Sequence, residues 1–362
     1  MKIAYLSIGN HIHTERWLCF FRDKGYEVHL ITSQPCKMDG IPVHQIGFSS
    51  LPKPIKYAFG LIRIKKILSK LNPDILHTHF LTGYGYWGAF SNFHPFILTV
   101  WGDDVYLTPR ESALKGFLAR YALGKADFVT GDSADIVEEA IRMGAKRDNA
   151  TVIQWGVDLS RFDPTVATDT RRELGIKEDE PVILSTRSFT KDYYNIDVIV
   201  DSIPDILKSF PNAKYIFTGY EGDDSRFVDK ARKLGISSST IFLGRVAHEK
   251  LPGLVRASDV FVTVPSVDAT AVSLLEAMAC GAAIVVSSLK SSLEWIENGK
   301  NGMVVEPGSR EELVGALLYL LKNPDKRKEF GKVSREIVSS RADHRKNMEK
   351  MDQIYKRFAA GR

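Results

Sequence analysis

The sequence predicts an α/β protein with two doubly wound parallel sheets, one in each half of the chain. A chain of 362 residues is long for a single hydrophobic core, so two domains are expected. Short runs rich in β-branched and aromatic residues alternate with longer segments of helical periodicity, which is typical of parallel sheets covered by helices. This alternation is interrupted at residues 156–170, a segment containing Gly, Asp and Pro that we interpret as a linker.

The first half contains six predicted strands separated by helical segments. The strands are expected at residues 2–8, 27–32, 74–79, 96–100, 127–131 and 150–154. The clearest helical periodicity lies in residues 14–24, 55–71 and 133–143. We therefore predict a first Rossmann-like domain over residues 1–160.

The second half repeats the pattern with five predicted strands. They are expected at residues 181–187, 213–219, 240–244, 259–264 and 282–286. The second domain is predicted over residues 161–342, and residues 343–358 form a charged final helix for which packing on the first domain is one alternative. Because open α/β sheets bind ligands at the carboxyl ends of their strands, two such domains are expected to face each other across a cleft.

Composition excludes several classes of protein. The chain is 44% hydrophobic and 26% charged, as in globular proteins, and no apolar run approaches the roughly 18–20 residues that span a bilayer. The N-terminus lacks the long apolar core of a signal peptide, and three scattered cysteines favour a reducing compartment. A net charge of +5 without a zinc-finger or RNA-binding motif does not indicate nucleic-acid binding. We predict a cytoplasmic protein.

The first strand leads into a turn with candidate ligand-binding residues. Gly9 can bring backbone N–H groups near a phosphate, although the G-x-G-x-x-G dinucleotide motif is absent. His13 and Arg16 follow and can meet an acceptor or a phosphate. An ordinary turn with surface side chains is the alternative.

Two later strands in the first half also end in polar or aromatic residues. His77 and His79 are expected to point to opposite faces of their strand, which would argue against a shared metal. Asp103 and Asp104 follow the strand at 96–100, next to Trp101. Hydrogen bonds to acceptor hydroxyls, or a helix N-cap, are favoured over a metal site for this pair.

The second half carries two cations and two carboxylates after its strands. Arg187 ends a strand and Lys191 follows, which suits a diphosphate because Arg offers a fork of donors and Lys a point charge. Asp268 and Glu276 lie eight positions apart among small and apolar residues. This spacing suggests a site that grips hydroxyl groups, and a helix cap plus one exposed acid is the alternative.

Several motifs resemble one family along nearly the whole chain. Residues 242–331, with LLEAMACG followed by ENGKNGMVVEPGS, resemble the retaining glycosyltransferases of family four, which have the GT-B fold. In the first half, GYEVHLIT, PDILHTH, ADFVTGDSADI and VIQWGVDLSRFDP agree. The resemblance implies that a hexosyl group moves from a nucleotide sugar, with UDP as the usual nucleotide, without a metal or other cofactor.

The resemblance also implies roles for residues. Glu276 matches the carboxylate that grips ribose, and Asp268 replaces a Glu that meets the transferred sugar. The implied catalytic residues are Arg187, Lys191 and Asp268. The implied nucleotide-binding set is Gly9, Arg187, Lys191, Gly244, Arg245, Ser273 and Glu276. The implied sugar- or acceptor-binding set is His13, Arg16, Trp101, Asp103, Asp104, Asp268, Ala269 and Thr270.

Three features depart from the family pattern. Trp101 stands where the family often has His, Ala269 and Ala271 replace glycines, and Lys191 follows Arg187 by four residues rather than five. The Asp268 and alanine replacements keep a non-catalytic subunit of a glycosylation complex open as one alternative, and a nucleotide-sugar epimerase on the same fold is another. The acceptor is expected to be a glycan, a lipid-linked molecule or a small molecule, as in polysaccharide or glycolipid biosynthesis.

Residues 53–70 suggest a membrane partner. They contain six basic residues, and no acidic residue occurs between Gly40 and Pro73. One hypothesis is that this helix docks a peripheral protein on anionic lipid at the inner face of a membrane. The alternative is a helix with an ordinary solvated face.

Overall fold

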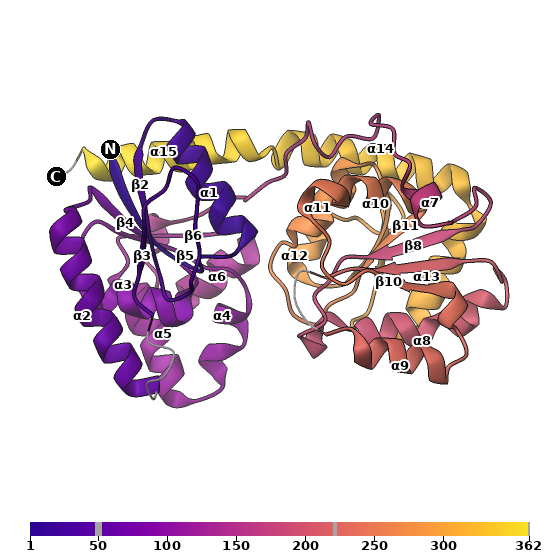
Figure 1. The fold of residues 1–362 in the computed structure, drawn as a ribbon, viewed down its shortest axis with the longest axis horizontal. Coiled ribbons are helices and arrows are strands. Elements are labelled where there is room, and N and C mark those ends of the chain that lie inside the picture. Colours follow the sequence, from indigo (N-terminus) through magenta and orange to yellow (C-terminus); the bar gives the residue numbers. More distant parts are fainter. Residues whose placement is uncertain (48–52, 220–222, 361–362) are drawn as a thin grey trace. The chain divides into compact units, whose positions relative to one another are not determined.

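The computed structural model describes residues 1–47, 53–219 and 223–360, which form two compact units (Figure 1). The first unit comprises Met1–Trp155 with Arg345–Arg362, and the second comprises Gly156–His344. Each unit contains one parallel sheet covered by helices. The prediction of an α/β protein with two Rossmann-like sheets is confirmed.

The first sheet has the strand order β3-β2-β1-β4-β5-β6-β7. Its strands are β1 (Lys2–Leu6), β2 (Glu27–Thr32), β3 (Val43–Gln45), β4 (Ile75–His79), β5 (Phe96–Thr99), β6 (Phe128–Gly131) and β7 (Ala150–Val152). All six predicted strands are present. The additional strand, β3, is a three-residue edge strand without a fully buried residue, so it has little hydrophobic pattern to detect.

Helices cover both faces of the first sheet. They are α1 (Ile12–Asp23), α2 (Lys53–Leu71), α3 (Tyr86–Ser91), α4 (Asp103–Tyr106), α5 (Ala113–Lys125), α6 (Ala134–Arg142) and α15 (His344–Ala359), with short helical turns at η1 (Leu81–Gly85), η2 (Thr108–Arg110) and η3 (Arg147–Asn149). Right-handed crossovers place α2, α3, α5 and α6 on one face and α1 on the other. The C-terminal helix α15 packs beside α1, since the ring centres of Phe21 in α1 and Tyr355 in α15 are 4.8 Å apart.

The second sheet has the order β10-β9-β8-β11-β12-β13. Its strands are β8 (Val182–Ser185), β9 (Lys214–Phe217), β10 (Thr240–Phe242), β11 (Val260–Thr263), β12 (Ala283–Ser287) and β13 (Met303–Val305). Its helices are α7 (Thr170–Glu173), α8 (Ile196–Leu207), α9 (Ser225–Lys233), α10 (Leu251–Ala257), α11 (Val272–Ala279), α12 (Lys290–Leu293), α13 (Arg310–Lys322) and α14 (Pro324–Arg341), with turns at η4 (Asp192–Tyr194), η5 (Ser237–Ser239) and η6 (His248–Lys250). The edge strand β13 was not predicted.

The segment interpreted as a linker packs firmly on the second unit. Phe162 is buried in the core of that unit. Arg335 of α14 donates to the carbonyl oxygens of Phe162 at 2.6 Å and Leu159 at 3.2 Å. These bonds satisfy backbone groups that regular structure leaves unpaired in this segment.

Helix α11, which carries Glu276, is held against α14 by a close approach of two glycines. A Cβ atom on Gly331 would lie 2.0 Å from the carbonyl oxygen of Gly281, which ends the α11 turn. We expect Gly331→Ala to lower the free energy of unfolding by about 1–3 kcal/mol, because overpacking forces backbone shifts. Urea unfolding measures this value.

Gly315→Ala in α13 is the matched control, since no atom lies within 4 Å of a Cβ built there. Alanine at this helical position should stabilise the protein by about 0.5–1 kcal/mol. Equal unfolding midpoints for the two variants would contradict the proposed close packing.

Candidate functional site

Arg187 and Asp268 form an ion pair where the strands of the second sheet end. The Arg187 Nη2 atom lies 2.5 Å from Asp268 Oδ2, and Arg187 Nε donates to Thr263 Oγ1 at 2.7 Å. The guanidinium carbon is 5.0 Å from the centre of the Tyr194 ring. Arg187 is only 9% exposed, so its charge is held in one place. Its Nε and Nη2 atoms already donate hydrogen bonds within the protein, so only part of its set of donors remains for a ligand.

The loop between β11 and α11 presents Asp268 and is fixed by side chains from other elements. Asn195 Nδ2 donates to the Val264 carbonyl and the Ser266 hydroxyl, both at 2.8 Å. Ser291 Oγ donates to the Asp268 carbonyl at 2.9 Å. The position of the Asp268 carboxylate is therefore set by tertiary contacts on both sides of its loop.

Two further predicted residues of this loop pack inside the second unit. Ala269 and Thr270 are buried, and Thr270 Oγ1 accepts a hydrogen bond from Trp295 Nε1 at 3.3 Å. Because alanine adds only a Cβ, Ala269 fits the packed turn that leads into α11.

Glu276 is paired with a histidine that sequence reasoning missed. His248 Nε2 lies 2.7 Å from Glu276 Oε1, and His248 Nδ1 lies 3.1 Å from Arg161 Nη1. A guanidinium can only donate, so Nδ1 of His248 accepts and its proton lies on Nε2. His248 therefore donates to one oxygen of Glu276 and leaves the other, Oε2, for a further donor.

The other residues of the second unit that were predicted to bind the nucleotide lie in loops or in the first turn of α11. Gly244 has a φ of +58°, which favours glycine, and its carbonyl accepts from Gly219 N at 3.0 Å. Arg245 is exposed, and Ser273 lies half-buried in the first turn of α11. The Lys191 ammonium lies 5.8 Å from the centre of the Tyr193 ring, in an exposed loop.

In the first unit, aromatic rings gather around Trp101 where the strands end. The Trp101 ring centre is 4.9 Å from those of His11 and Trp155 and 6.2 Å from that of His13. The structure thus brings two predicted residues, His13 and Trp101, into one cluster. Arg16 is half-buried in the next turn of α1.

The N-cap alternative is wrong for Asp104, because the N-cap residue of α4 is Gly102, without a side-chain capping bond, and Asp104 lies inside the helix. Its buried carboxylate accepts from the backbone N–H groups of Leu81 at 2.6 Å, Gly102 at 2.7 Å and Trp101 at 3.0 Å. Burial raises the pKa of Asp104 to about 6 against the effect of these donors. Asp104 therefore holds together the turns after β4 and β5, while Asp103 is half-buried at the start of α4.

Gly9 has a packing reason to be glycine. A Cβ atom there would lie 2.5 Å from Cys36 Sγ and 3.0 Å from Thr32. This close approach fixes the turn after β1 and accounts for the glycine independently of any phosphate.

The expectation for His77 and His79 was wrong. Residues two apart on a strand share a face, and the two rings are 4.6 Å apart. His77 Nδ1 bonds to Tyr355 Oη at 2.5 Å and its Nε2 to Thr99 Oγ1 at 2.7 Å. Burial lowers the pKa of both rings, to about 3 for His79. They form a neutral core that anchors the C-terminal helix.

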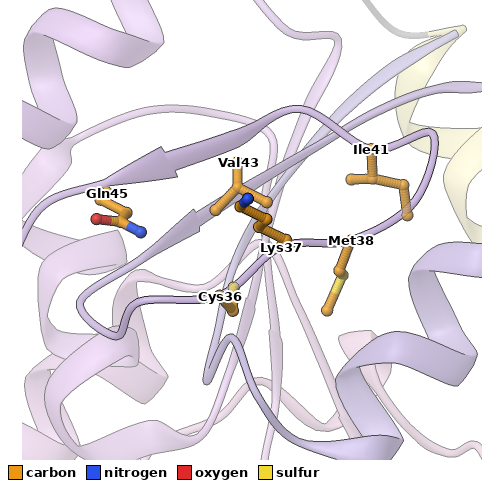
Figure 2. Close-up of a pocket in the computed structure, with 6 residues that line it drawn as sticks. All are labelled: Cys36, Lys37, Met38, Ile41, Val43 and Gln45. Atoms are coloured by element: carbon orange, nitrogen blue, oxygen red, sulfur yellow. The ribbon is translucent and has the colours of Figure 1, made fainter.

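An open hollow of about 560 Å³ lies at the edge of the first sheet (Figure 2). Its lining residues come from β3 and the segment before it, namely Cys36, Lys37, Met38, Ile41, Val43 and Gln45. These residues include no carboxylate and no aromatic ring, so we assign no chemistry to it. Within the described ranges, no group of three or more His, Cys, Asp or Glu residues could hold a metal ion.

His248 escaped prediction because its partners are distant in sequence. It lies 28 positions before Glu276 and 87 after Arg161. A single histidine in HEKLPG has no spacing signal of its own. Its only detectable feature is its place in the turn after a predicted strand, at residues 240–244.

Comparisons with known proteins point to one family. The family described as "Glycosyl transferases group 1" matches residues 166–337, and "Glycosyl transferase 4-like" matches residues 2–133. The chain is 22% identical to N-acetyl-alpha-D-glucosaminyl L-malate synthase of Bacillus anthracis, covering 92% of this chain and 90% of that protein. It is 25% identical to alpha-monoglucosyldiacylglycerol synthase of Acholeplasma laidlawii, covering 83% and 81%.

A solved structure shares the fold. HepE from Anabaena, solved in complex with UDP and glucose, matches with a TM-score of 0.84 at 18% identity, over 98% of this chain and 99% of that one. Together with the two sheets and the matched family regions, this likeness identifies the architecture. The chain belongs to the group 1 glycosyltransferases and has the GT-B fold.

Proposed function

We propose that this protein is a retaining glycosyltransferase that uses a nucleotide sugar, with UDP as the nucleotide. The observation that carries the proposal is the buried Arg187–Asp268 pair beside Thr263, at the carboxyl end of β11. A fixed cation next to a carboxylate suits a diphosphate joined to a sugar that becomes cationic. UDP is supported by HepE, which was solved with UDP and glucose.

Each residue then has a distinct task. Arg187 stabilises the departing diphosphate, with Lys191 as a second cation, so the positive charge comes from side chains rather than a metal. Glu276 accepts hydrogen bonds from the ribose hydroxyls through Oε2. Asp268 faces the transferred sugar. The second unit is accordingly the donor domain, and the first unit, with its cluster around Trp101, binds the acceptor.

The proposed reaction needs no protein nucleophile. The bond between the anomeric carbon and the phosphate oxygen breaks, and the diphosphate keeps the electron pair. The acceptor hydroxyl oxygen bonds to the anomeric carbon on the same face, and its proton passes to the leaving phosphate oxygen. Retention follows because departure and attack share one face.

A thermal-shift series of nucleotides and nucleotide sugars tests the proposal, since ligands that bind only the folded state raise its Tm. We expect UDP and a UDP-sugar to raise Tm more than uridine. NMR of the product formed with an acceptor should show the donor's anomeric configuration. Interconversion of the donor without acceptor would instead indicate an epimerase, and binding without turnover a non-catalytic subunit.

His248 should position Glu276 for ribose. We expect His248→Leu to raise the donor KM roughly fivefold with kcat nearly unchanged, since a hydrogen bond to a charged group contributes about 1.5–3 kcal/mol and only part of this is lost. The preference for UDP over 2′-deoxy-UDP should shrink by a similar factor. Isothermal titration with both nucleotides measures this preference.

His248→Gln offers an amide N–H at a similar reach and should restore the preference. Lys250→Gln, a change at an exposed position of the same turn, is the control and should leave the preference intact. If His248→Leu discriminates between the two nucleotides as well as the unaltered protein, His248 does not act through ribose binding.

A further inference from the structure

Large apolar side chains are exposed on three helices of the first unit. Of the eleven large apolar residues that are exposed in the described part of the chain, seven lie on α2, α3 and α5. They are Ile55, Tyr57, Phe59, Ile62, Phe90, Leu114 and Phe117. These helices contain only 38 residues, so the exposure is concentrated on one part of the molecule.

Helix α3 adjoins both α2 and α5 (Figure 1). Trp87 Nε1 of α3 donates to the Tyr57 carbonyl of α2 at 2.9 Å. Three residues further along α3, the Phe90 ring stacks on Tyr121 of α5 at 4.9 Å. We call the exposed side chains of α2, α3 and α5 the basic-apolar surface.

The buried and the exposed apolar residues of α2 lie on opposite faces of the helix. Gly60, Ile64 and Leu68 are buried and mark the face that packs on the protein. Ile55, Phe59 and Ile62, spaced at four and three residues, lie on the opposite face and are 45%, 48% and 64% exposed. On that same face the next residues are the exposed Lys66 and Lys70.

Charge distinguishes this surface from the rest of the chain. The three helices contain nine Lys and Arg residues and no Asp or Glu. Without these nine, the chain's 49 basic residues fall to 40 against 44 acidic residues. The net positive charge of the protein therefore comes entirely from these helices.

We propose that the basic-apolar surface docks on an anionic lipid bilayer, with apolar side chains of α2 and α5 entering the interface. Basic side chains are attracted to anionic headgroups, while apolar ones gain by leaving water. A second copy of this chain is disfavoured, because a two-fold interface would place positive surfaces against each other. This inference does not rest on the proposed reaction, although it fits a lipid-linked acceptor.

No helix in the described ranges is long and apolar enough to cross a membrane, so docking is proposed at the surface of the bilayer. Co-sedimentation of the full chain with two kinds of vesicle tests it. One kind is phosphatidylcholine alone, and the other is equal parts phosphatidylcholine and phosphatidylglycerol. We expect strong binding only to the anionic vesicles, weakened by salt.

Two double variants separate the electrostatic contribution to vesicle binding from the hydrophobic one. Lys66→Glu with Lys70→Glu reverses two exposed charges and should lower the partition coefficient more than a hundredfold, at about fivefold per unit of charge. Ile62→Ser with Phe117→Ser should lower it at least tenfold and make the remaining binding more sensitive to salt.

Matched controls come from the second unit. Lys328→Glu with Lys332→Glu has the same spacing on α14, and Val166→Ser with Leu293→Ser removes similarly exposed apolar groups. Both should bind vesicles normally, and every variant should keep its affinity for UDP. Equal binding to both vesicles, no binding, equal losses in the controls, or a dimer that the Ile62/Phe117 variant dissociates would each overturn the proposal.

Discussion

Arg187→Ala should weaken the binding of a nucleoside diphosphate by about ten- to a hundredfold and leave the affinity for the nucleoside nearly unchanged. A hydrogen bond from a charged group contributes roughly 1.5–3 kcal/mol, which corresponds to this range. The structure adds a second reason. Removing Arg187 leaves Asp268 without the cation 2.5 Å away, so its carboxylate would repel an incoming diphosphate.

Isothermal titration with UDP and with uridine measures both affinities. Arg226→Ala is a suitable control, because Arg226 also pairs with an aspartate, Asp192, and lies 5.0 Å from a ring, that of Phe227, but is exposed. Arg187→Lys should recover part of the loss, since it restores charge without the fork. Equal losses for UDP and uridine would refute the assignment of Arg187 to the diphosphate.

The second large effect separates Glu276 from Asp268. If Glu276 holds ribose, it binds ground and transition states alike, so Glu276→Gln should raise the donor KM and weaken UDP binding while kcat changes little. If Asp268 faces the sugar, Asp268→Asn should lower kcat. Its UDP affinity should hold or improve, because Arg187 loses a competing partner and the site loses a negative charge.

Steady-state donor kinetics and UDP titration on both variants decide between these roles. Asp268→Glu, which restores the family residue, should lengthen the reach and shift the preference among donor sugars. An Asp268→Asn protein that loses UDP as severely as Glu276→Gln would show that the roles are wrongly divided.

The sequence by itself determined the architecture, because alternation between strands and helices is a local property. A buried parallel strand such as residues 282–286, AAIVV, is a continuous apolar run, so its position was predictable. The edge strands β3 and β13 were missed because two of the three residues of β3, VHQ, are polar, and because β13, MVV, is only three residues long and lies between turn residues. Family motifs singled out Glu276, Asp268 and Arg187 as candidate site residues without any coordinates.

Only the tertiary structure decided which side chains meet. Arg187 and Asp268 are 81 positions apart, and His248 and Glu276 are 28 apart, so no local spacing could pair them. The same holds for the C-terminal helix, whose Tyr355 reaches Tyr5 Oη at 2.8 Å across 350 positions. Secondary structure follows from short-range sterics and hydrophobic periodicity, whereas a site forms where chain crossovers bring distant strand ends together. For that reason the sequence supplied the candidate residues, and the fold selected their partners.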